Sequence, residues 1–288
     1  MVVVGDVATD VVAVLAGKPA PGSDRPAAIS SRGGGAGANV AAHLARLGAP
    51  VLLAGCIGDD VAGASLAAEL TAVGVRLALR RVQGVPTGTI VSLVEPGGQR
   101  SMLADRGANL HLRPDDVPLP TPGGHLHLSG YTLLDPGPRG AGLAALEAAV
   151  AAGCTVSVDP ASTGPLRRYG VERWLADTAA ATLLLPNDDE ARLLTGCTDV
   201  EDAARTLARR HRIVAVSLGA DGALWATGED LVHRPAHPTE VVDTTGAGDA
   251  FAAGLLATWL ARPDGSPAAA LDAGLARAAE VVRRPGAR

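Results

Sequence analysis

The feature that most constrains the fold is a repeated alternation of short apolar runs with segments of helical pattern. Apolar residues recur at helical spacing, for example at Val40, Leu44 and Leu47. Between such segments lie runs typical of strands buried on both faces, at 2–5, 51–55, 125–130, 155–159, 182–186 and 213–219. This alternation predicts an α/β fold with a mainly parallel central sheet and helices on both of its faces.

One region departs from this rhythm. From Val75 to Met102 apolar and polar residues alternate, and "TGTIVSLVEPGGQRSMLAD" predicts two strands around a turn at "PGGQ". We expect residues 11–32 to add further strands to the same small sheet. No internal repeat or linker interrupts the chain. The sequence therefore predicts a single domain over 1–288, with a β lid built from roughly 11–32 and 75–104.

Composition excludes several classes of function. Aromatic residues make up only 2% of the chain, so stacking platforms for nucleic acid are nearly absent, and the net charge of −5 argues against a surface that binds polyanions. No apolar run is long enough to span a bilayer. The three cysteines form no CxxC pair, which favours a reducing compartment. We expect a cytoplasmic protein with neither nucleic-acid nor membrane partners.

The segment "DTTGAGDAF", residues 243–251, joins an apolar stretch to a helix that we expect over 247–260. Its glycines allow backbone amides to approach a ligand, and the helix start adds partial positive charge, which together favour a bound anion. Asp249 then has two interpretations. It is either a first-turn acid stabilised by the helix dipole or a general base beside a bound phosphoryl group. The residues alone leave both open.

Three further segments carry candidate site residues, and each also has an ordinary structural explanation. The glycine-rich stretch at 33–48 lacks the third glycine of a dinucleotide fingerprint, so it is either a flexible helix start or a binding loop. Asp10 in "GDVATD" is expected just past the carboxyl end of a strand, where a turn carboxylate is also common. Asn187 and Glu190 fit a helix N-cap with its first-turn acid.

Together these segments resemble the signatures of the ribokinase-like (PfkB) family of carbohydrate and nucleoside kinases, in the expected order from Gly5 to Ala287. The resemblance implies an ATP-dependent kinase that phosphorylates a primary hydroxyl of a sugar or sugar-like molecule. It makes Asp249 the catalytic base, and it places an anion hole at Gly246, Ala247 and Gly248.

The same resemblance implies the other members of the site. The sugar would be held by Asp10, Gly34, Gly35 and Asn39. Glu190 would organise Mg²⁺ through water, and carbonyls near Asp243 and Thr245 are candidates for a monovalent cation such as K⁺. The nucleotide would contact Asn187, Ser217, Gly219 and Gly222. A homodimer formed through the lid is also typical of the family.

Two alternatives share this fold: a nucleoside kinase of the same family, and a sugar-binding protein without activity. The scarcity of aromatic residues favours a simple sugar or sugar acid over a purine nucleoside, and Tyr131 is the aromatic residue to watch. His125 and His127 are interpreted as structural. Arg106, beside the predicted lid, is either a group that reaches substrate or phosphate or, more commonly for such arginines, a surface charge. An oxidoreductase is disfavoured because the first strand is not followed by GxGxxG.

Overall fold

The computed structural model describes residues 1–18, 22–96, 100–284, 286 and 287. Its centre is a nine-stranded sheet of order β13-β12-β11-β10-β9-β8-β1-β4-β5. The strands are parallel except for the last two in sequence, which pair antiparallel at one edge. They are β1 (Val2–Val4), β4 (Leu52–Gly58), β5 (Arg76–Val82), β8 (His125–Ser129), β9 (Thr155–Asp159), β10 (Leu183–Leu184), β11 (Ile213–Ser217), β12 (Ala223–Thr227) and β13 (Asp230–Arg234). The predicted α/β fold with a mainly parallel sheet is confirmed.

Helices cover both faces of this sheet, and alternate strand residues pack into two separate cores. In β1, Val2 and Val4 belong to one core and Val3 belongs to the other. The first core is covered by α4 (Pro136–Ala151), α5 (Thr163–Tyr169), α6 (Val171–Asp177), α7 (Asp188–Thr195) and α8 (Val200–Ala208). The second is covered by α1 (Ala36–Arg46), α2 (Val61–Ala72), α9 (Ala247–Ala261) and α10 (Pro267–Val281).

Short elements join these layers. They are the helix α3 (Tyr131–Leu134) and the 3₁₀ turns at Gly107–His111, Pro114–Asp116 and Gly219–Asp221. The helix predicted over 247–260 is confirmed as α9. None of the helices in the described ranges combines the length and the hydrophobicity that a bilayer span requires.

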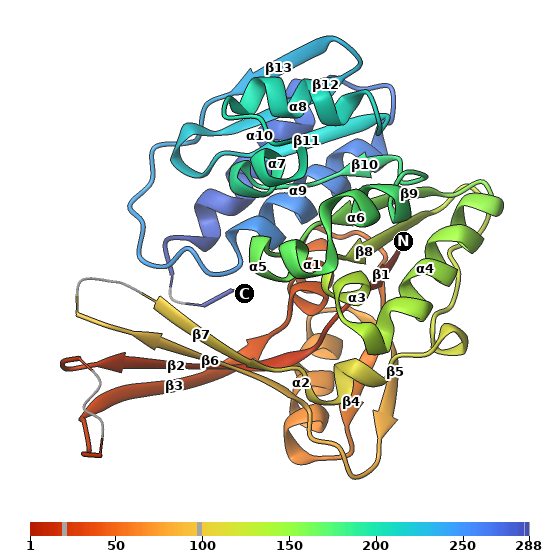
Figure 1. Ribbon diagram of the computed structural model, residues 1–288. Coiled ribbons are helices and arrows are strands. Elements are labelled where there is room, and N and C mark those ends of the chain that lie inside the picture. The colour runs from red at the N-terminus through yellow and green to blue at the C-terminus, as the bar shows by residue number, and fades with distance from the viewer. Residues whose placement is uncertain (19–21, 97–99, 285, 288) are drawn as a thin grey trace.

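A second sheet of four strands extends from one side of the main body (Figure 1). Its order is β3-β2-β6-β7, with a parallel pair at the centre and antiparallel pairs outside. The strands are β2 (Ala8–Leu15), β3 (Ala27–Gly34), β6 (Gly88–Val94) and β7 (Arg100–Asp105). Residues 19–21, within the predicted lid segment 11–32, and residues 97–99 of the predicted "PGGQ" turn lie outside the described residues.

The predicted extent of the lid needs one correction. Residues 76–82, expected in the lid, form β5, which pairs in parallel with β4 at the edge of the main sheet. An edge strand is only half covered, so its residues alternate between polar and apolar just as lid strands do. The second lid segment therefore begins at Gly88. The first begins at Ala8, and only three residues separate it from the end of β1 at Val4.

Candidate active site

Asp249 lies in the first turn of α9, and its surroundings are built by glycine. Gly246 precedes the helix with φ 76°, a left-handed backbone conformation that residues other than glycine rarely adopt. A Cβ on Gly248 would meet nothing within 4 Å, so the space beside this residue is open. The Ala247 amide donates to the Thr244 carbonyl at 3.2 Å, which leaves the amides of Gly246 and Gly248 as the better candidates for an anion hole.

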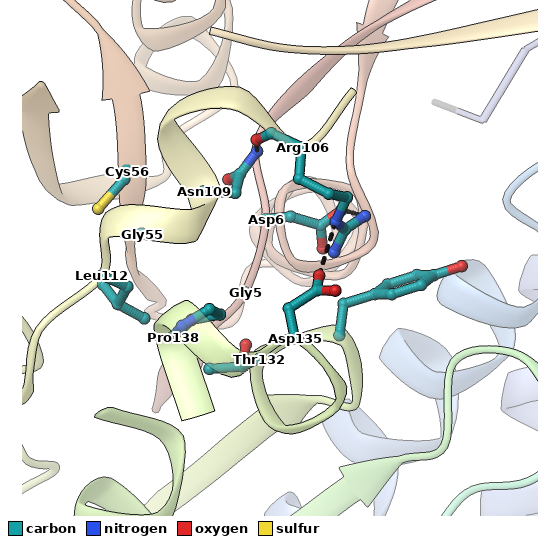
Figure 2. A pocket seen from close by; sticks show the side chains of 11 residues that line it. Gly5, Asp6, Gly55, Cys56, Arg106, Asn109, Leu112, Thr132, Asp135 and Pro138 are labelled. Carbon is teal, nitrogen blue, oxygen red and sulfur yellow. Dashed lines mark hydrogen bonds and ion pairs between the residues drawn. The ribbon is translucent and has the colours of Figure 1, made fainter. Parts of the chain in front are cut away.

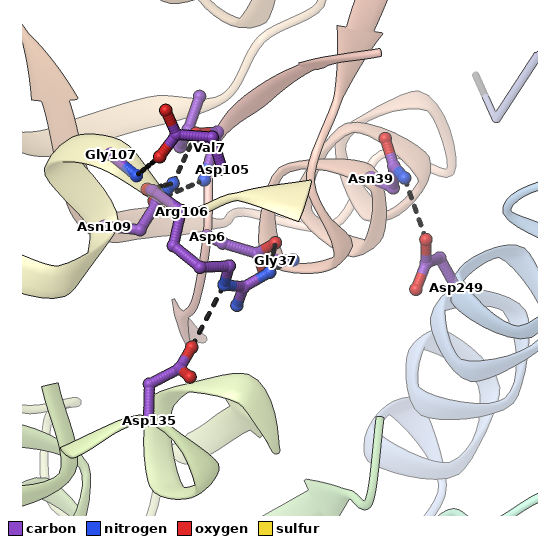
Figure 3. Close-up of polar contacts among 10 residues, drawn as sticks. All are labelled: Asp6, Val7, Gly37, Asn39, Asp105, Arg106, Gly107, Asn109, Asp135 and Asp249. Carbon is purple, nitrogen blue, oxygen red and sulfur yellow. Dashed lines mark hydrogen bonds and ion pairs between the residues drawn. The ribbon is translucent and has the colours of Figure 1, made fainter. Parts of the chain in front are cut away.

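Asp249 is tied to the first glycine-rich segment. Its Oδ2 accepts a hydrogen bond from Nδ2 of Asn39 at 2.8 Å, across 210 residues of sequence (Figure 3). Asn39 is 4% exposed, and its Oδ1 is buried without a hydrogen-bond partner in the described part of the chain. That oxygen can accept a hydrogen bond from a hydroxyl group that enters the site.

A cavity of about 160 Å³, here called the central cavity, brings Asp249 together with two other acids. Asp159 ends strand β9, and Glu190 lies in the first turn of α7 at 3% exposure. The remaining wall includes Ala36, Tyr131, Ala161, Asn187, Ser217, Gly246 and Gly248. The structure therefore joins catalytic and nucleotide-binding candidates from three separate sequence segments around one space.

Burial, and then the charge of Asp159, raise the pKa values of both Asp249 and Glu190. Burial raises the pKa of Asp249 well above its usual range, and the charges of Asp159, Asp6 and Asp10 act in the same direction, against the hydrogen bond from Asn39. Burial and the nearby Asp159 raise the pKa of Glu190 to about 8. A cluster of carboxyl groups with raised pKa values is an unfavourable place for negative charge unless a cation enters it.

The side of the site that faces the lid contains the predicted sugar-binding residues. A Cβ on Gly34 would lie 2.2 Å from a carboxylate oxygen of Asp10, so glycine is required for this contact. Gly35 has φ 92°, and its Cβ would lie 2.5 Å from the carbonyl oxygen of Asp6. Asp10 is the third residue of β2 and is not at the end of a strand as expected. Asp6 takes that position, two residues after β1.

An ion-pair cluster lies beside these residues, and its arginine is one for which the sequence favoured a surface position. Arg106 contacts Asp6 at 3.4 Å and Asp135 at 3.0 Å, and its guanidinium lies 4.0 Å from the centre of the Tyr131 ring (Figure 2; Figure 3). Its side chain is only 15% exposed. Arg106 is therefore a largely buried member of an ion-pair cluster and not a surface charge, because the fold brings Asp6, 100 residues away in sequence, next to it.

A larger cavity of about 530 Å³, here called the apolar cavity, adjoins the central one. The two share Ser217, Gly248 and Phe251. The predicted nucleotide-binding residues Gly219 and Gly222 line the apolar cavity. Its other walls include His237, Pro238, Val241, Leu275, Ala278, Ala279 and Val282, which the sequence patterns did not single out. Its size suits a small organic ligand whose charged end reaches the central cavity.

A sequence model described as pfkB family carbohydrate kinase matches residues 1–288. The chain belongs to the PfkB family. It is 36% identical to an ATP-dependent ribose-1-phosphate kinase of Halopiger xanaduensis, over 93% of this chain and 87% of that protein. It is 35% identical to a fructokinase of Klebsiella pneumoniae, over 85% of this chain and 83% of that protein.

Solved structures agree with this PfkB assignment. An adenosine kinase from Sinorhizobium meliloti superposes with a TM-score of 0.89 at 26% identity, covering 100% of this chain and 94% of that one. An aminoimidazole riboside kinase from Salmonella enterica, complexed with aminoimidazole riboside and an ATP analogue, superposes with a TM-score of 0.79 at 29% sequence identity. That likeness covers 99% of this chain and 94% of the other. The chain is thus an ATP-dependent sugar or nucleoside kinase of the PfkB family.

Asn187 and Glu190 of this PfkB chain form a capping box. The Glu190 amide donates to Oδ1 of Asn187 at 2.8 Å, and the Asn187 amide donates to Oε2 of Glu190 at 3.0 Å. The structural interpretation of this pair is therefore correct. The same bonds fix the Glu190 carboxylate at the wall of the central cavity, so the cap also positions an acid.

Asp243 and Thr245 hold the PfkB turn together through their side chains. Oδ1 of Asp243 accepts from the amide of Thr245 at 2.9 Å and from its hydroxyl at 2.7 Å. Oδ2 of Asp243 accepts from the amide of Gly286 at 2.9 Å, which ties the turn to the end of the chain. Their predicted part in binding a monovalent cation stays a prediction.

Asp159 is the acid that sequence reasoning missed altogether. It ends a predicted strand, but "TVSVDPAS" contains no spacing that singles it out. Burial raises its pKa to about 6, although its Oδ1 accepts a short 2.6 Å hydrogen bond from the amide of Ala161. Ala161 has φ 72°, a strained conformation for a residue with a side chain, and it also lines the central cavity. Backbone strain concentrated at a cavity wall is typical of functional sites.

Proposed function

We propose that this kinase transfers the terminal phosphoryl group of ATP to a primary hydroxyl of a sugar or sugar-like acceptor, with Asp249 as the general base. One observation carries this proposal. The Asp249 carboxylate lies between the lid-side residues, through its hydrogen bond with Asn39, and the two joined cavities that contain the nucleotide-binding candidates. A base there can meet an acceptor on one side and a phosphoryl group on the other.

In the proposed reaction Asp249 accepts the proton of the acceptor hydroxyl as its oxygen attacks the phosphorus, and the bond to the leaving ADP oxygen breaks. The bond from Nδ2 of Asn39 holds one carboxylate oxygen and leaves the other for the proton. The amides of Gly246 and Gly248 and the α9 dipole would stabilise charge on the transferred group. Closure of the lid would exclude water from the site.

Magnesium fits the acids on the opposite wall. Burial and the charge of Asp159 raise the pKa of Glu190, so a divalent cation bound near these two acids would remove an electrostatic cost. In the described ranges no three His, Cys, Asp or Glu side chains form a complete metal cage. Magnesium often keeps several waters and takes one or two carboxylates, so this pair is sufficient. When bound, Mg²⁺ would neutralise charge on the nucleotide phosphates. A K⁺ ion near the carbonyls of Asp243 and Thr245 remains part of the proposal.

The acceptor is proposed to be a simple sugar or sugar acid. Tyr131 is the aromatic residue at the central cavity besides Phe251, and its ring is already covered by the Arg106 guanidinium at 4.0 Å. That arrangement leaves little room for a purine base to stack. A nucleoside acceptor is the second candidate, supported by the likeness to adenosine kinase and aminoimidazole riboside kinase.

A panel of sugars, sugar phosphates and nucleosides, assayed by ADP release, tests the acceptor class. The Asp249→Asn variant should lose turnover by about 10²–10⁴-fold while it still binds Mg·ATP. The control is Asp264→Asn, which changes an exposed aspartate in the loop after α9 and should leave turnover unchanged. Wild-type turnover in Asp249→Asn would remove Asp249 from the mechanism.

The lid supports the proposal of a homodimer. Its strands expose large apolar side chains, at 70% for Ile29, 62% for Met102, 58% for Leu103 and 49% for Val14. Apolar patches on a sheet without covering helices are typical of protein interfaces. Sedimentation analysis of the wild type and of Ile29→Asp would test this arrangement, and a wild-type monomer at micromolar concentration would contradict it.

A further inference from the structure

A cavity of about 310 Å³ lies between α1 and α10 and shares no lining residue with the central or apolar cavity. We call it the arginine cavity. Its walls include His43 and Arg46 of α1, Arg277 and Glu280 of α10, and Arg284 just after that helix. Three guanidinium groups thus meet one carboxylate, in a chain whose net charge is −5. The arginine cavity is therefore locally positive in a protein whose net charge is negative.

The neighbouring side chains only partly balance these arginines. Arg277 is 14% exposed; it forms an ion pair with Glu280, and its Nη2 donates to Nδ1 of His43 at 3.1 Å. Its Nε is buried and lacks a hydrogen-bond partner among the described residues. Burial and the Arg277 charge lower the pKa of Arg46, so these two guanidinium groups repel each other. An anion in the arginine cavity would remove that repulsion.

The size and donor geometry of the arginine cavity select a class of ligand. Small-molecule sites typically have volumes of about 300–1,000 Å³, a range that includes this cavity. Guanidinium groups bind phosphate through paired hydrogen bonds, and several of them around one space favour a doubly charged phosphate over a single carboxylate. The Glu280 carboxylate can accept a hydrogen bond from a hydroxyl of the same ligand. These features fit a phosphorylated hydroxy compound.

Two contacts connect the arginine cavity to the catalytic turn. His43 follows Asn39, the partner of Asp249, by one turn of α1. Because Nδ1 of His43 accepts from Arg277, its Nε2 carries the proton and donates to the carbonyl oxygen of Ala287 at 2.9 Å. Ala287 in turn packs on Gly246, where an added Cβ would lie only 2.5 Å from the alanine Cβ.

We propose that the arginine cavity is a second anion site, which binds the phosphate group of a small metabolite and is coupled to the catalytic turn through His43 and Ala287. The ligand is not the phosphoryl donor, because the arginine cavity does not open on the residues that surround Asp249. A phosphate there would pull Arg277 and Arg284 toward α1 and change how firmly Ala287 packs on Gly246.

Calorimetric titration with inorganic phosphate tests the site. The wild-type protein is first saturated with Mg²⁺ and a non-hydrolysable ATP analogue, so that the catalytic anion hole is filled. We expect saturable binding, weakened about tenfold or more in the Arg46→Ala/Arg284→Ala double variant. Arg212→Ala, which removes an exposed arginine outside the arginine cavity, should bind like the wild type. Absence of saturable binding in the wild type, or equal binding in the double variant, would overturn the proposal.

Kinetic measurements test the coupling. Phosphate should change the acceptor KM or kcat of the wild type by about fivefold, and this response should vanish in the double variant, whose basal turnover is retained. If phosphate acts only as a competitor of ATP, and equally in both proteins, the coupling is refuted. The binding experiment does not require turnover, so its result is independent of the role proposed for Asp249.

Discussion

The two glycine-rich turns of this kinase begin two helices that face the same site, yet their glycines have different structural roles. In the turn before α1, glycines let chain segments touch, since a Cβ on Gly34 would strike Asp10 and one on Gly37 would lie 2.6 Å from the Cα of Gly5. In the turn before α9, Gly246 accommodates Ala287, but Gly248 has nothing within 4 Å. Gly248 lines both the central and the apolar cavity, which distinguishes it from exposed glycines such as Gly140 that also have open space beside them. The contrast separates glycines that serve packing from one beside which we propose that a ligand binds.

The largest effect is expected at Gly246, where packing and conformation both require glycine. Gly246→Ala places a side chain at φ 76° and against Ala287, so the free energy of unfolding should fall by about 2–4 kcal/mol, with loss of activity. Urea unfolding and ADP release measure the two losses. The control is Gly140→Ala, at an open position inside α4, which should be neutral or stabilising. Equal stability of the two variants would contradict this account.

A smaller loss, confined mainly to the acceptor, is expected at Gly34. Gly34→Ala pushes a methyl group into the Asp10 carboxylate, which should cost about 1–3 kcal/mol of stability and raise the acceptor KM. The nucleotide KM should change much less, because Gly34 lies on the lid side of the site. Steady-state kinetics with each substrate varied in turn measures this split. A variant with a raised nucleotide KM and a normal acceptor KM would reverse the assignment of the two turns.

Gly248 should separate binding from stability most cleanly. Gly248→Ala adds a methyl group in open space, so the unfolding free energy should stay within about 0.5 kcal/mol of the wild type. The same methyl group enters the space shared by the central and apolar cavities, so kcat/KM for ATP should fall about tenfold. Full activity in a stable Gly248→Ala protein would show that no ligand uses this space.

The smallest effect concerns the acids opposite the α9 turn. The pKa of Glu190 is raised from its usual 4.5 to about 8, so the folded protein holds this proton more tightly than the unfolded chain does. The contribution to stability is complete below pH 4.5 and is lost as the pH rises through about 8. Without metal, the melting temperature should therefore fall by a few degrees from pH 5 to pH 8, and Mg²⁺ should restore it.

Two variants sharpen this pH test. Glu190→Gln keeps the shape of the cap and should flatten the pH dependence while it reduces the effect of Mg²⁺. Glu201→Gln, in the first turn of α8 and exposed, should behave like the wild type. Scanning calorimetry across the pH range measures all three proteins. If the Glu190→Gln protein keeps the full pH dependence of the melting temperature, another group is responsible for it.

The sequence predicted correctly those features that depend on residues close together in the chain. The strand runs, α9 and the position of Asp249 follow from residues adjacent in the chain, and short-range patterns reveal them. The cluster of Asp6, Arg106 and Asp135 could not be found in this way, because its members meet only after the sheet has formed. The edge strand β5 was assigned to the lid for a related reason. The alternation of apolar and polar residues indicates that one face of a strand is buried, but it does not indicate which sheet the strand joins.

Only three residues, Gly5 to Val7, connect the central strand β1 to the lid strand β2. Asp6 lies within that connection, and Asp10 lies just beyond it. Any motion that tilts the lid therefore also moves both of these carboxylates. If Asp10 holds the sugar as proposed, lid rigidity and sugar preference cannot be adjusted separately, because a substitution chosen to stiffen β2 also moves that carboxylate.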